Sequence, residues 1–357
     1  YRNTKNVPYY VFGRGSLAQL GDLLKPRREA VDGPVVYFVD HFFRDHELIG
    51  RLPMEKGDQL HFVDSSSEPE VTRIDAFKEA VSAADSRTPC CVVGIGGGNA
   101  LDTAKAVANL LTNPGKAEDY QGWELVKNPA VYKIGIPTLS GTGSECSRTC
   151  VLTNIPKNLK LGMNSDYTVY DQLLLDPDLL ATVPRDQYFY TGIDTFMHCV
   201  ESLQGSYRNA IIDAFSVRAV QLCEEIFLSD DMMSEENREK MMIASYIGGM
   251  AAGNVGVIHP FSAGLGVVLH VAHGLGNCLA LNVLGDIYPK EYKQFRTMIE
   301  RQGVNLPTGI CKDLTEEQYE GLYRGCIVHE KPLTNALGPD FKQILTRENL
   351  IERYKSI

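Results

Sequence analysis

Asp194 and His198 are the residues whose types and spacing most directly suggest chemistry. They lie four positions apart in the segment 192-GIDTFMHCVES-202, which has helical character, so both side chains project from one helical face. Their neighbours are largely apolar, which predicts burial of that face. A carboxylate and an imidazole placed there are potential ligands for a metal ion. Two simpler explanations stay open: a core histidine bonded to the backbone, and an aspartate that complements the helix dipole.

Two further potential ligands, His259 and His273, lie in the segment 254-NVGVIHPFSAGLGVVLHVAHGLGN-277. They are fourteen residues apart, which on one straight helix would separate them by about 21 Å. The chain must therefore bend between them if both bind one ion, and we expect the bend at helix-breaking residues. These residues are Pro260, Gly264, Gly266 and Gly274. His270 lies one helical turn before His273, so a pairing of His270 with His273 is an open alternative.

Together, Asp194, His198, His259 and His273 would supply three nitrogen donors and one carboxylate. This mixed set suits zinc or ferrous iron and leaves a coordination position for substrate. A divalent ion at such a site would act as a Lewis acid toward a bound substrate oxygen. No side chain in the sequence stands out as the general base.

A glycine-rich turn follows a predicted buried strand in the segment 94-GIGGGNALDTAK-105. Gly96, Gly97 and Gly98 precede a helix predicted to begin near Ala100, so free backbone N–H groups would face an approaching phosphate or pyrophosphate. The turn lacks the Gly-Lys-Ser/Thr sequence of a Walker A loop, and its spacing does not match G-x-G-x-x-G. A tight turn without a ligand is the simpler alternative.

A second turn, 137-PTLSGTGSE-145, carries hydroxyl groups and glycines after another predicted strand. Two such turns at strand carboxyl ends of one open sheet are where a dinucleotide would lie. Asp40 ends an earlier predicted strand, where its carboxylate would accept hydrogen bonds from a ribose and repel a 2′-phosphate. This arrangement favours NAD over NADP, although a solvated aspartate at a strand end is the alternative.

The elements that must position these residues differ between the two halves of the chain. Buried strands are predicted at 34–40, 60–64, 91–96 and 133–138, and helices between them at 70–85 and 100–113. This alternation predicts an α/β domain with a Rossmann-like, mostly parallel sheet over residues 1–183. From Pro184 onward, helical patterns at 184–203, 209–229 and 235–254 predict an all-α helical bundle over residues 184–357.

The composition indicates a globular protein with a small-molecule ligand. The 357 residues exceed the usual size of one hydrophobic core, so two domains are expected. A net charge of -10 argues against nucleic-acid and anionic-membrane partners, which select basic surfaces. Nine cysteines, an odd number without zinc-finger spacing, indicate reduced thiols in a cytoplasmic protein. No apolar run approaches the roughly 18 residues that a membrane span requires.

The motifs together resemble those of the group III, iron-containing alcohol dehydrogenases, whose fold is shared with dehydroquinate synthase and glycerol dehydrogenase. The resemblance covers nearly the whole chain. The matching segments are 12–20, 96–106, 136–145, 175–184, 192–201 and 256–277. The resemblance implies a dehydroquinate synthase-like fold, NAD(H) and one divalent ion (zinc or iron) as cofactors, and a homodimer.

Position by position, the resemblance assigns roles to individual residues. It implies four metal ligands, which are Asp194, His198, His259 and His273. His270 is not among them. It places these residues in the turn that binds the cofactor phosphates: Gly96, Gly97, Gly98, Asp102 and Lys105. It places Thr138 and Thr142 near the nicotinamide, and Asp40 at the position associated with NAD preference.

The chain also departs from the family pattern. Asn99 stands where the family usually has Ser, and its amide can still donate to a phosphate. Ala263 replaces a histidine that many members carry near the nicotinamide. The second departure disfavours a simple ethanol-type or butanol-type dehydrogenase.

Within the family, several segments are most similar to the 3-deoxy-D-manno-octulosonate (Kdo) 8-oxidase branch, which supplies an aldehyde for amination to an 8-amino sugar of lipopolysaccharide. These segments are 120–130, 141–152, 161–172, 188–203 and 311–314. The similarity implies NAD-linked oxidation of Kdo at C8, with coupling to an aminotransferase. Arg148 and Lys160 are candidate partners for the carboxylate of the sugar acid, chosen by chemistry type. Surface or cofactor-side charges are the alternative for both.

Other functions remain open at this stage. A general group III alcohol or polyol dehydrogenase would act on another small alcohol. A dehydroquinate synthase-like lyase would use the same fold, NAD and metal without net redox change, but its usual Lys and Arg constellation is not evident. A non-catalytic NAD-binding or sugar-nucleotide-binding module is disfavoured by the four intact ligand positions.

Overall fold

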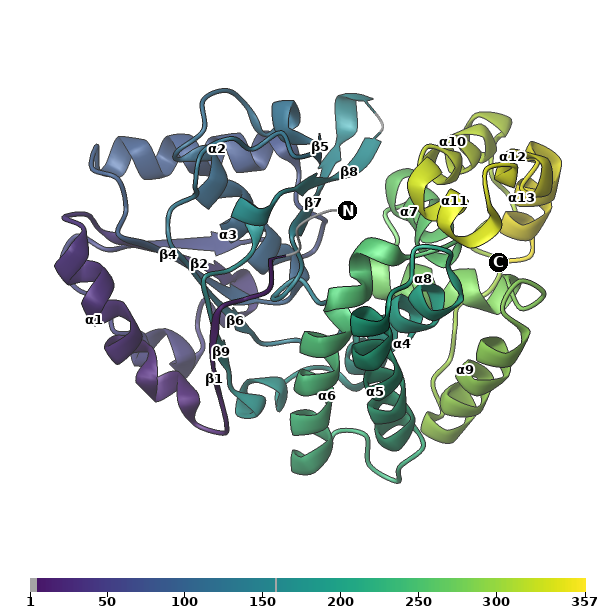
Figure 1. Ribbon diagram of the computed structural model, residues 1–357, viewed down its shortest axis with the longest axis horizontal. Helices are drawn as coiled ribbons and strands as arrows, with labels where there is room; N and C mark the ends of the chain where they lie inside the picture. Colours follow the sequence, from purple (N-terminus) through teal and green to yellow (C-terminus); the bar gives the residue numbers. More distant parts are fainter. Residues whose placement is uncertain (1–4, 158) are drawn as a thin grey trace. The chain divides into compact units, whose positions relative to one another are not determined.

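The computed structural model describes residues 5–157 and 159–357, which divide into two compact units (Figure 1). The first unit comprises the described residues up to 139 together with 144–182. The second comprises 140–143 and 183–357. The segment 140–143 therefore groups with the second unit, although the chain on both sides of it belongs to the first.

A six-stranded parallel sheet forms the centre of the first unit. Its strands lie in the order β1 (Tyr9–Phe12), β9 (Gln172–Leu175), β6 (Lys133–Pro137), β4 (Cys91–Gly96), β2 (Val35–Asp40) and β3 (Gln59–Val63). Every neighbouring pair is parallel. The predicted parallel sheet is thus confirmed, and β2, β3, β4 and β6 are its four predicted strands. β1 and β9 extend the sheet beyond the prediction.

Helices cover both faces of this sheet, because its central strands are apolar on both sides. On β2, Val36 and Phe38 pack with the buried side chains of α2 (Val71–Ala84) and α3 (Gly98–Leu110). Val35, Tyr37 and Val39 point the other way and pack with α1 (Leu20–Ala30). Figure 1 shows α1 and α2 on opposite sides of the sheet.

A smaller sheet completes the first unit and was not predicted. It consists of β5 (Gly122–Trp123), β8 (Leu159–Asn164) and β7 (Thr149–Asn154), with β7 and β8 antiparallel. Short 3-10 helices of this unit are η1 (Ser16–Gln19), η2 (His41–Phe43), η3 (Glu47–Arg51), η4 (Ala117–Tyr120), η5 (Ile155–Lys157), η6 (Asp166–Thr168) and η7 (Pro177–Leu180).

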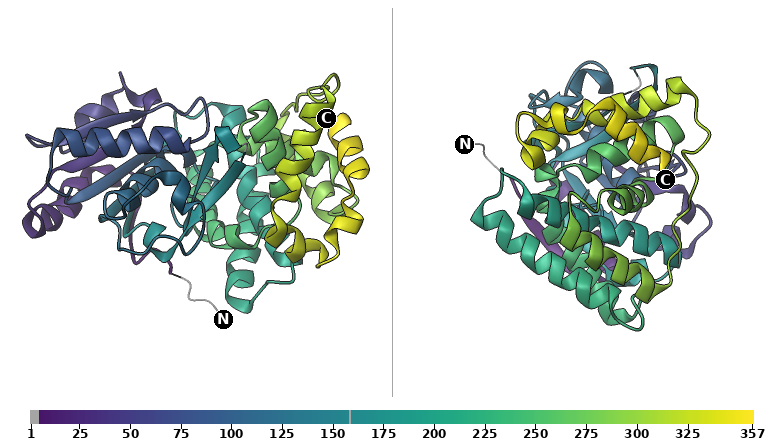
Figure 2. Two further views of the ribbon diagram at one scale, coloured as in Figure 1. Left: turned by 90° about the horizontal axis from the view of Figure 1, so that it is seen from above. Right: turned by 90° about the vertical axis from the view of Figure 1, so that its right-hand side faces the viewer.

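The second unit is helical, as predicted, and no strand occurs in the part of it that the structure describes. Its helices are α4 (Arg185–Gln204), α5 (Ala210–Phe227), α6 (Glu235–Gly248), η8 (Gly249–Asn254), α7 (Ile258–Leu269), α8 (His273–Val283), α9 (Pro289–Gln302), α10 (Glu316–Ile327), α11 (Glu330–Leu337), α12 (Phe341–Ile344) and α13 (Arg347–Lys355). α4 packs against α5 and α8, and α10 packs on α7. Figure 2 shows the green-to-yellow part of this unit as helices in both views. Within the described ranges, no single helix is long and apolar enough to cross a membrane.

The bend between His259 and His273 exists, but its predicted position is wrong. Pro260 lies in the first turn of α7, where its missing N–H is not needed. Gly264 also lies inside α7, where a Cβ on Gly325 of α10 would come within 2.9 Å of its Cα, so it serves close helix packing. The chain turns instead after Leu269, at His270, which is in the left-handed conformation with φ 55°.

The buried carboxylate of Asp58 ties three segments of the first unit together. It accepts hydrogen bonds from both terminal nitrogens of Arg28 on α1, at 2.9 and 2.6 Å, and from the backbone N–H groups of Val35 and Glu55. Its side chain is only 2% exposed, whereas that of Arg28 is 18% exposed. Removal of one partner from a buried pair of this kind is expected to destabilise the fold far more than removal of one partner from a surface ion pair.

Replacement of Asp58 by Ala is therefore expected to lower the free energy of unfolding by about 3 kcal/mol, since Arg28 loses its buried partner. Burial alone would raise the pKa of Asp58, but Arg28 and the backbone donors lower it overall. The stabilisation is then fully present above the unfolded-state pKa, about 3.9, and is lost as the pH falls toward the folded-state pKa. Urea unfolding at neutral and acidic pH measures both effects.

The matched control is Asp32→Ala, because Asp32 also pairs with an arginine, Arg87, but its side chain is 89% exposed. Its loss should change stability by less than about 1 kcal/mol. Equal effects of the two substitutions would contradict the role given to Asp58.

Candidate metal and nucleotide sites

The carboxylate of Asp194 is the centre of a cluster of imidazoles in the second unit. Asp194 and His198 project from the same face of α4, while His259 lies in the first turn of α7 and His273 is the first residue of α8. Ligand atoms of Asp194, His259 and His273 all lie within 4.8 Å of one another. The turn at His270 thus allows two helices to present imidazoles to a third.

Three of the four predicted ligands, Asp194, His259 and His273, form this set, and His198 lies beside it, close to Asp194. The Nε2 atoms of His259 and His198 lie 3.1 and 3.7 Å from Asp194 Oδ1, and His273 Nε2 lies 3.6 Å from Asp194 Oδ2. The rings of His198 and His259 stack with centroids 4.4 Å apart. His270, the alternative ligand, is exposed at the turn and does not belong to the set of ligand atoms.

The residues present fit a divalent ion. Asp194 Oδ2 is fully buried and has no hydrogen-bond partner among the described residues, which is unusual for a buried carboxylate. A cation would satisfy this oxygen. Three imidazoles and one carboxylate are the donor set of zinc and ferrous iron sites.

Burial and the neighbouring carboxylates set the protonation states in the cluster. Burial alone would lower the pKa of His259, but Glu201 and Asp194 raise it to about 9, so binding of an ion would displace a proton from this ring. Burial lowers the pKa of His198 to about 4, so its ring is neutral near pH 7. Burial alone would raise the pKa of Asp194, but the facing imidazoles lower it well below its usual range. A neutral imidazole and an ionised carboxylate are the forms that bind metal ions.

Two further residues contact the ligands and were missed by the sequence analysis. The buried amide of Asn277 donates from Nδ2 to Asp194 Oδ1 at 2.7 Å and lies 3.3 Å from His273 Nε2. Glu201 bonds to Nδ1 of His259. Their spacing was an available signal, because Glu201 follows His198 by three residues and Asn277 follows His273 by four, which places each pair on one helical face.

The glycine-rich turn of the first unit has the backbone that an anion site requires. Gly96 has φ +152°, and a Cβ there would lie 2.6 Å from the Cβ of Ala100. Gly97 is the N-cap of α3, and no side chain caps the helix. The first backbone N–H groups of α3 therefore lack a side-chain acceptor, in keeping with a phosphate-binding turn.

Asp40 and Asn99 lie beside this turn and make specific contacts. Asp40 ends β2, accepts from Phe42 N at 3.0 Å, and accepts from Ser65 Oγ at 2.7 Å. The amide of Asn99 donates to the carbonyl oxygens of Ser65 and Ser67. Asn99 thus holds the loop after β3, and a phosphate would have to compete for its amide.

Asp102 and Lys105, assigned to the phosphate turn by resemblance, bind protein groups in the structure. Asp102 accepts from Ser144 Oγ and from Val151 N, and Lys105 donates to Ser144 O at 2.8 Å and to Thr149 O. Both residues are buried, and they form an ion pair at 3.2 Å. Their contacts attach the segment 144–151 to α3.

The two threonines of the hydroxyl turn lie in different units. Thr138 belongs to the first unit, where its backbone N–H donates to Gly96 O at 3.0 Å and so joins the ends of β6 and β4. Thr142 belongs to the segment 140–143 of the second unit. That segment is fixed there by Gly141 N, which donates to Ser245 Oγ, and by Thr195 Oγ1, which donates to Gly141 O.

The two cations predicted to bind a substrate carboxylate are paired with acidic residues. Arg148 donates to Asp166 and to Glu124, each at 2.7 Å. Lys160 donates to Glu68 at 2.6 Å. An anionic substrate would have to displace these carboxylates in order to bind either cation.

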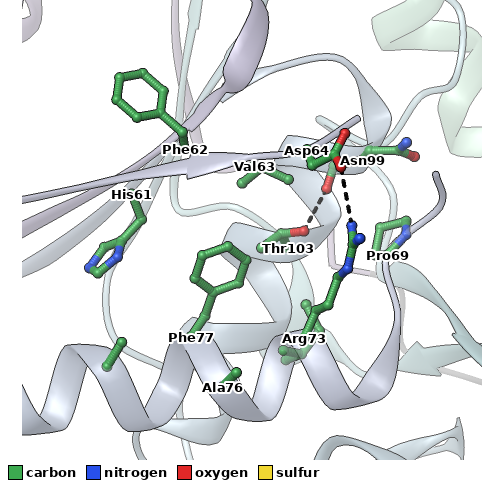
Figure 3. Close-up of a pocket in the computed structure, with 12 residues that line it drawn as sticks. His61, Phe62, Val63, Asp64, Pro69, Arg73, Ala76, Phe77, Asn99 and Thr103 are labelled. Carbon is green, nitrogen blue, oxygen red and sulfur yellow. Dashed lines mark hydrogen bonds and ion pairs between the residues drawn. The ribbon is translucent and has the colours of Figure 1, made fainter. Parts of the chain in front are cut away.

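A cavity of about 410 Å³ lies in the first unit between β3, α2 and α3 (Figure 3). Its walls include Val63, Ile74 and Phe77, and Asn99 and Thr103 contribute the side next to the glycine-rich turn. Figure 3 shows the guanidinium of Arg73 directed toward Asp64, with which it forms an ion pair at 3.8 Å. Asn99 is the only residue of the cavity wall that the sequence analysis assigned to a site.

Comparison with known proteins identifies the family. The model of the iron-containing alcohol dehydrogenases matches residues 8–177, and that of the C-terminal domain of the Fe-containing alcohol dehydrogenase family matches residues 188–321. The chain belongs to the iron-containing alcohol dehydrogenase family. The predicted family is thus confirmed, whereas the Kdo 8-oxidase branch stays a prediction.

Individual members of the family show how far the similarity extends. Sulfoacetaldehyde reductase of Bilophila wadsworthia is 34% identical over 220 residues, which are 60% of this chain and 56% of that protein. The NAD-dependent methanol dehydrogenase of Bacillus methanolicus is 29% identical over 76% of this chain and 71% of its own length. Among solved structures, sulfoacetaldehyde reductase from Bifidobacterium kashiwanohense in complex with NAD+ superposes with a TM-score of 0.80 at 24% identity, covering 99% of this chain and 98% of that chain, which supports the fold.

Proposed function

We propose that the protein is a metal-dependent, NAD-linked oxidoreductase that interconverts a primary alcohol and its aldehyde. The observation that carries the proposal is the buried carboxylate of Asp194, which faces three imidazoles in a member of the iron-containing alcohol dehydrogenase family. When bound, the divalent ion supplies Lewis acidity to a substrate oxygen, and NAD supplies the hydride acceptor.

The chain's own residues would hold these cofactors. Asp194, His259, His273 and the adjacent His198 would hold the ion, and Asn277 orients the carboxylate of Asp194. In the first unit, the backbone of residues 96–98 binds the pyrophosphate, and Asp40 accepts hydrogen bonds from the adenosine ribose.

The proposed substrate is an anionic sugar acid, with Kdo oxidised at C8 to the aldehyde. The support is the similarity of segments 120–130, 161–172 and 188–203 to the Kdo 8-oxidase branch. An aminotransferase that consumes the aldehyde would be the next reaction. The identity with sulfoacetaldehyde reductase favours a second candidate, the reduction of a small anionic aldehyde.

A substrate panel tests the proposal. Protein stripped by a chelator and reloaded with zinc or ferrous iron is assayed by nicotinamide absorbance with Kdo, sulfoacetaldehyde, methanol and 1,3-propanediol. Kdo is expected to exceed the neutral alcohols in kcat/KM by about tenfold to hundredfold, because an Arg148 or Lys160 that exchanges its acidic partner for the substrate carboxylate gains a charge-assisted hydrogen bond of about 1.5–3 kcal/mol. If sulfoacetaldehyde is turned over faster than Kdo, the second candidate function is the correct one. Full activity without metal would contradict the proposed metal-dependent function.

A further inference from the structure

Glu201 is a fully buried carboxylate on the same face of α4 as Asp194 and His198. Its side chain is 0% exposed. Burial of a carboxylate is strongly unfavourable unless charged or polar partners compensate for the lost water. The contacts of Glu201 therefore show which groups compensate for its burial and what the carboxylate holds in place.

Both oxygens of Glu201 are used, and every partner lies in or next to the segment that carries His259. Oε1 accepts from Ile258 N at 2.6 Å and from Tyr288 Oη at 3.4 Å, and Oε2 bonds to Nδ1 of His259. Tyr288 Oη also accepts from Val257 N at 3.1 Å. Glu201 and Tyr288 thus hold the first turn of α7 through both backbone and side chain.

Close packing around this network keeps Glu201 in one position. A Cβ at Gly256 would lie 2.5 Å from Tyr288 Oη and 3.1 Å from Glu201 Oε1. Tyr288 itself is only 2% exposed. The carboxylate therefore has little freedom to turn away from the imidazole of His259.

The bond to Nδ1 determines which nitrogen of His259 is free to bind an ion. When Nδ1–H donates to Glu201, Nε2 is the nitrogen left to bind an ion, and it faces Asp194 Oδ1 at 3.1 Å. The carboxylate also makes the ring a stronger donor to a cation. Asp194 and His198 lie on the same helix as Glu201, so α4 supplies both ligands and the group that aligns a third.

We propose that Glu201 is a positioning residue of the metal site, which fixes the tautomer and orientation of His259 through its Nδ1 and thereby raises the affinity of the cluster for a divalent ion. This inference rests on the proposed metal-dependent function. It assigns to Glu201 no contact with the substrate or the nucleotide.

The test compares Glu201→Gln, which removes the charge but keeps one oxygen, with Glu201→Leu, which removes both. The zinc dissociation constant is measured by competition with a chromophoric chelator, and cobalt-substituted protein is examined by visible absorption. Loss of such an outer carboxylate weakens metal binding by about 10- to 100-fold. Zinc affinity is expected to be highest in the wild type, lower in the Gln variant and lowest in the Leu variant. The cobalt spectrum is expected to be shifted in both variants.

The matched control is Ser202→Ala, because Ser202 is the next residue on α4, is equally buried, and its hydroxyl has no hydrogen-bond partner among the described residues. It should leave zinc affinity and the cobalt spectrum unchanged. If the Leu variant does not fold, the Gln variant still decides. Native zinc affinity and an unshifted cobalt spectrum in a folded Glu201 variant would overturn the role given to Glu201 but not the proposed function. A wild-type protein that binds no ion would overturn the proposed function itself.

Discussion

Replacement of His259 by Ala is expected to empty the metal site and abolish turnover. His259 Nε2 lies 3.1 Å from Asp194 Oδ1, the shortest of the contacts between the imidazoles and that carboxylate. Loss of a direct ligand should weaken ion binding by more than the roughly 100-fold seen when an outer partner is lost. Since Lewis-acid stabilisation contributes several kcal/mol, kcat/KM should fall by about 1,000-fold or more.

Ion content by elemental analysis after dialysis, together with kcat/KM at saturating metal, measures this result. The matched control is His270→Asn, because His270 was the alternative ligand and asparagine tolerates its left-handed backbone. That variant should keep its ion. A His259→Ala protein that retains a full complement of ion, or loss of the ion in the His270 variant, would contradict the assignment of ligands.

Three of the four strands that could be predicted from sequence, β2, β4 and β6, are buried on both faces. β9 is also buried but was missed, because its apolar run is only three leucines long. β2 and β4 have no side chain exposed to water along nearly their whole length, so they appear in the sequence as continuous apolar runs. β1 is largely exposed, and β8 has a mixed pattern that depends on its antiparallel pairing with β7. Neither strand leaves a signal in its own residues, because pairing with distant segments makes it a strand.

The candidate metal site could also be predicted from the sequence only in part. The types and spacing of Asp194 and His198 indicated a ligand pair, but the turn at His270 could not be foreseen, because a non-glycine residue in the left-handed conformation carries no clear signal. Glu201 was overlooked although it shares the helical face of Asp194. Its role follows from the docking of α7 on α4, which a periodicity argument does not describe.

Replacement of Gly96 by Ala is expected to remove most of the affinity for NAD. Gly96 ends β4 with φ +152°, a conformation that residues with a Cβ rarely adopt, and its Cβ would lie 2.6 Å from Ala100 Cβ and 3.0 Å from Asp40 Cβ. The turn must therefore shift, and with it the start of α3 and the carboxylate of Asp40. Strain of about 1–3 kcal/mol corresponds to a rise of roughly 5-fold to 150-fold in the dissociation constant.

Isothermal titration of the protein with NAD measures this change, and the double variant Gly96→Ala with Ala100→Gly separates its two causes. The second substitution removes the closest contact but leaves the backbone strain, so it should restore part of the lost affinity. Gly50→Ala is the control, because a Cβ at Gly50 meets no atom within 4 Å. Native NAD affinity in Gly96→Ala would show that the turn does not bind the pyrophosphate. A rise in the dissociation constant without any recovery in the double variant would assign the whole effect to the backbone at Gly96.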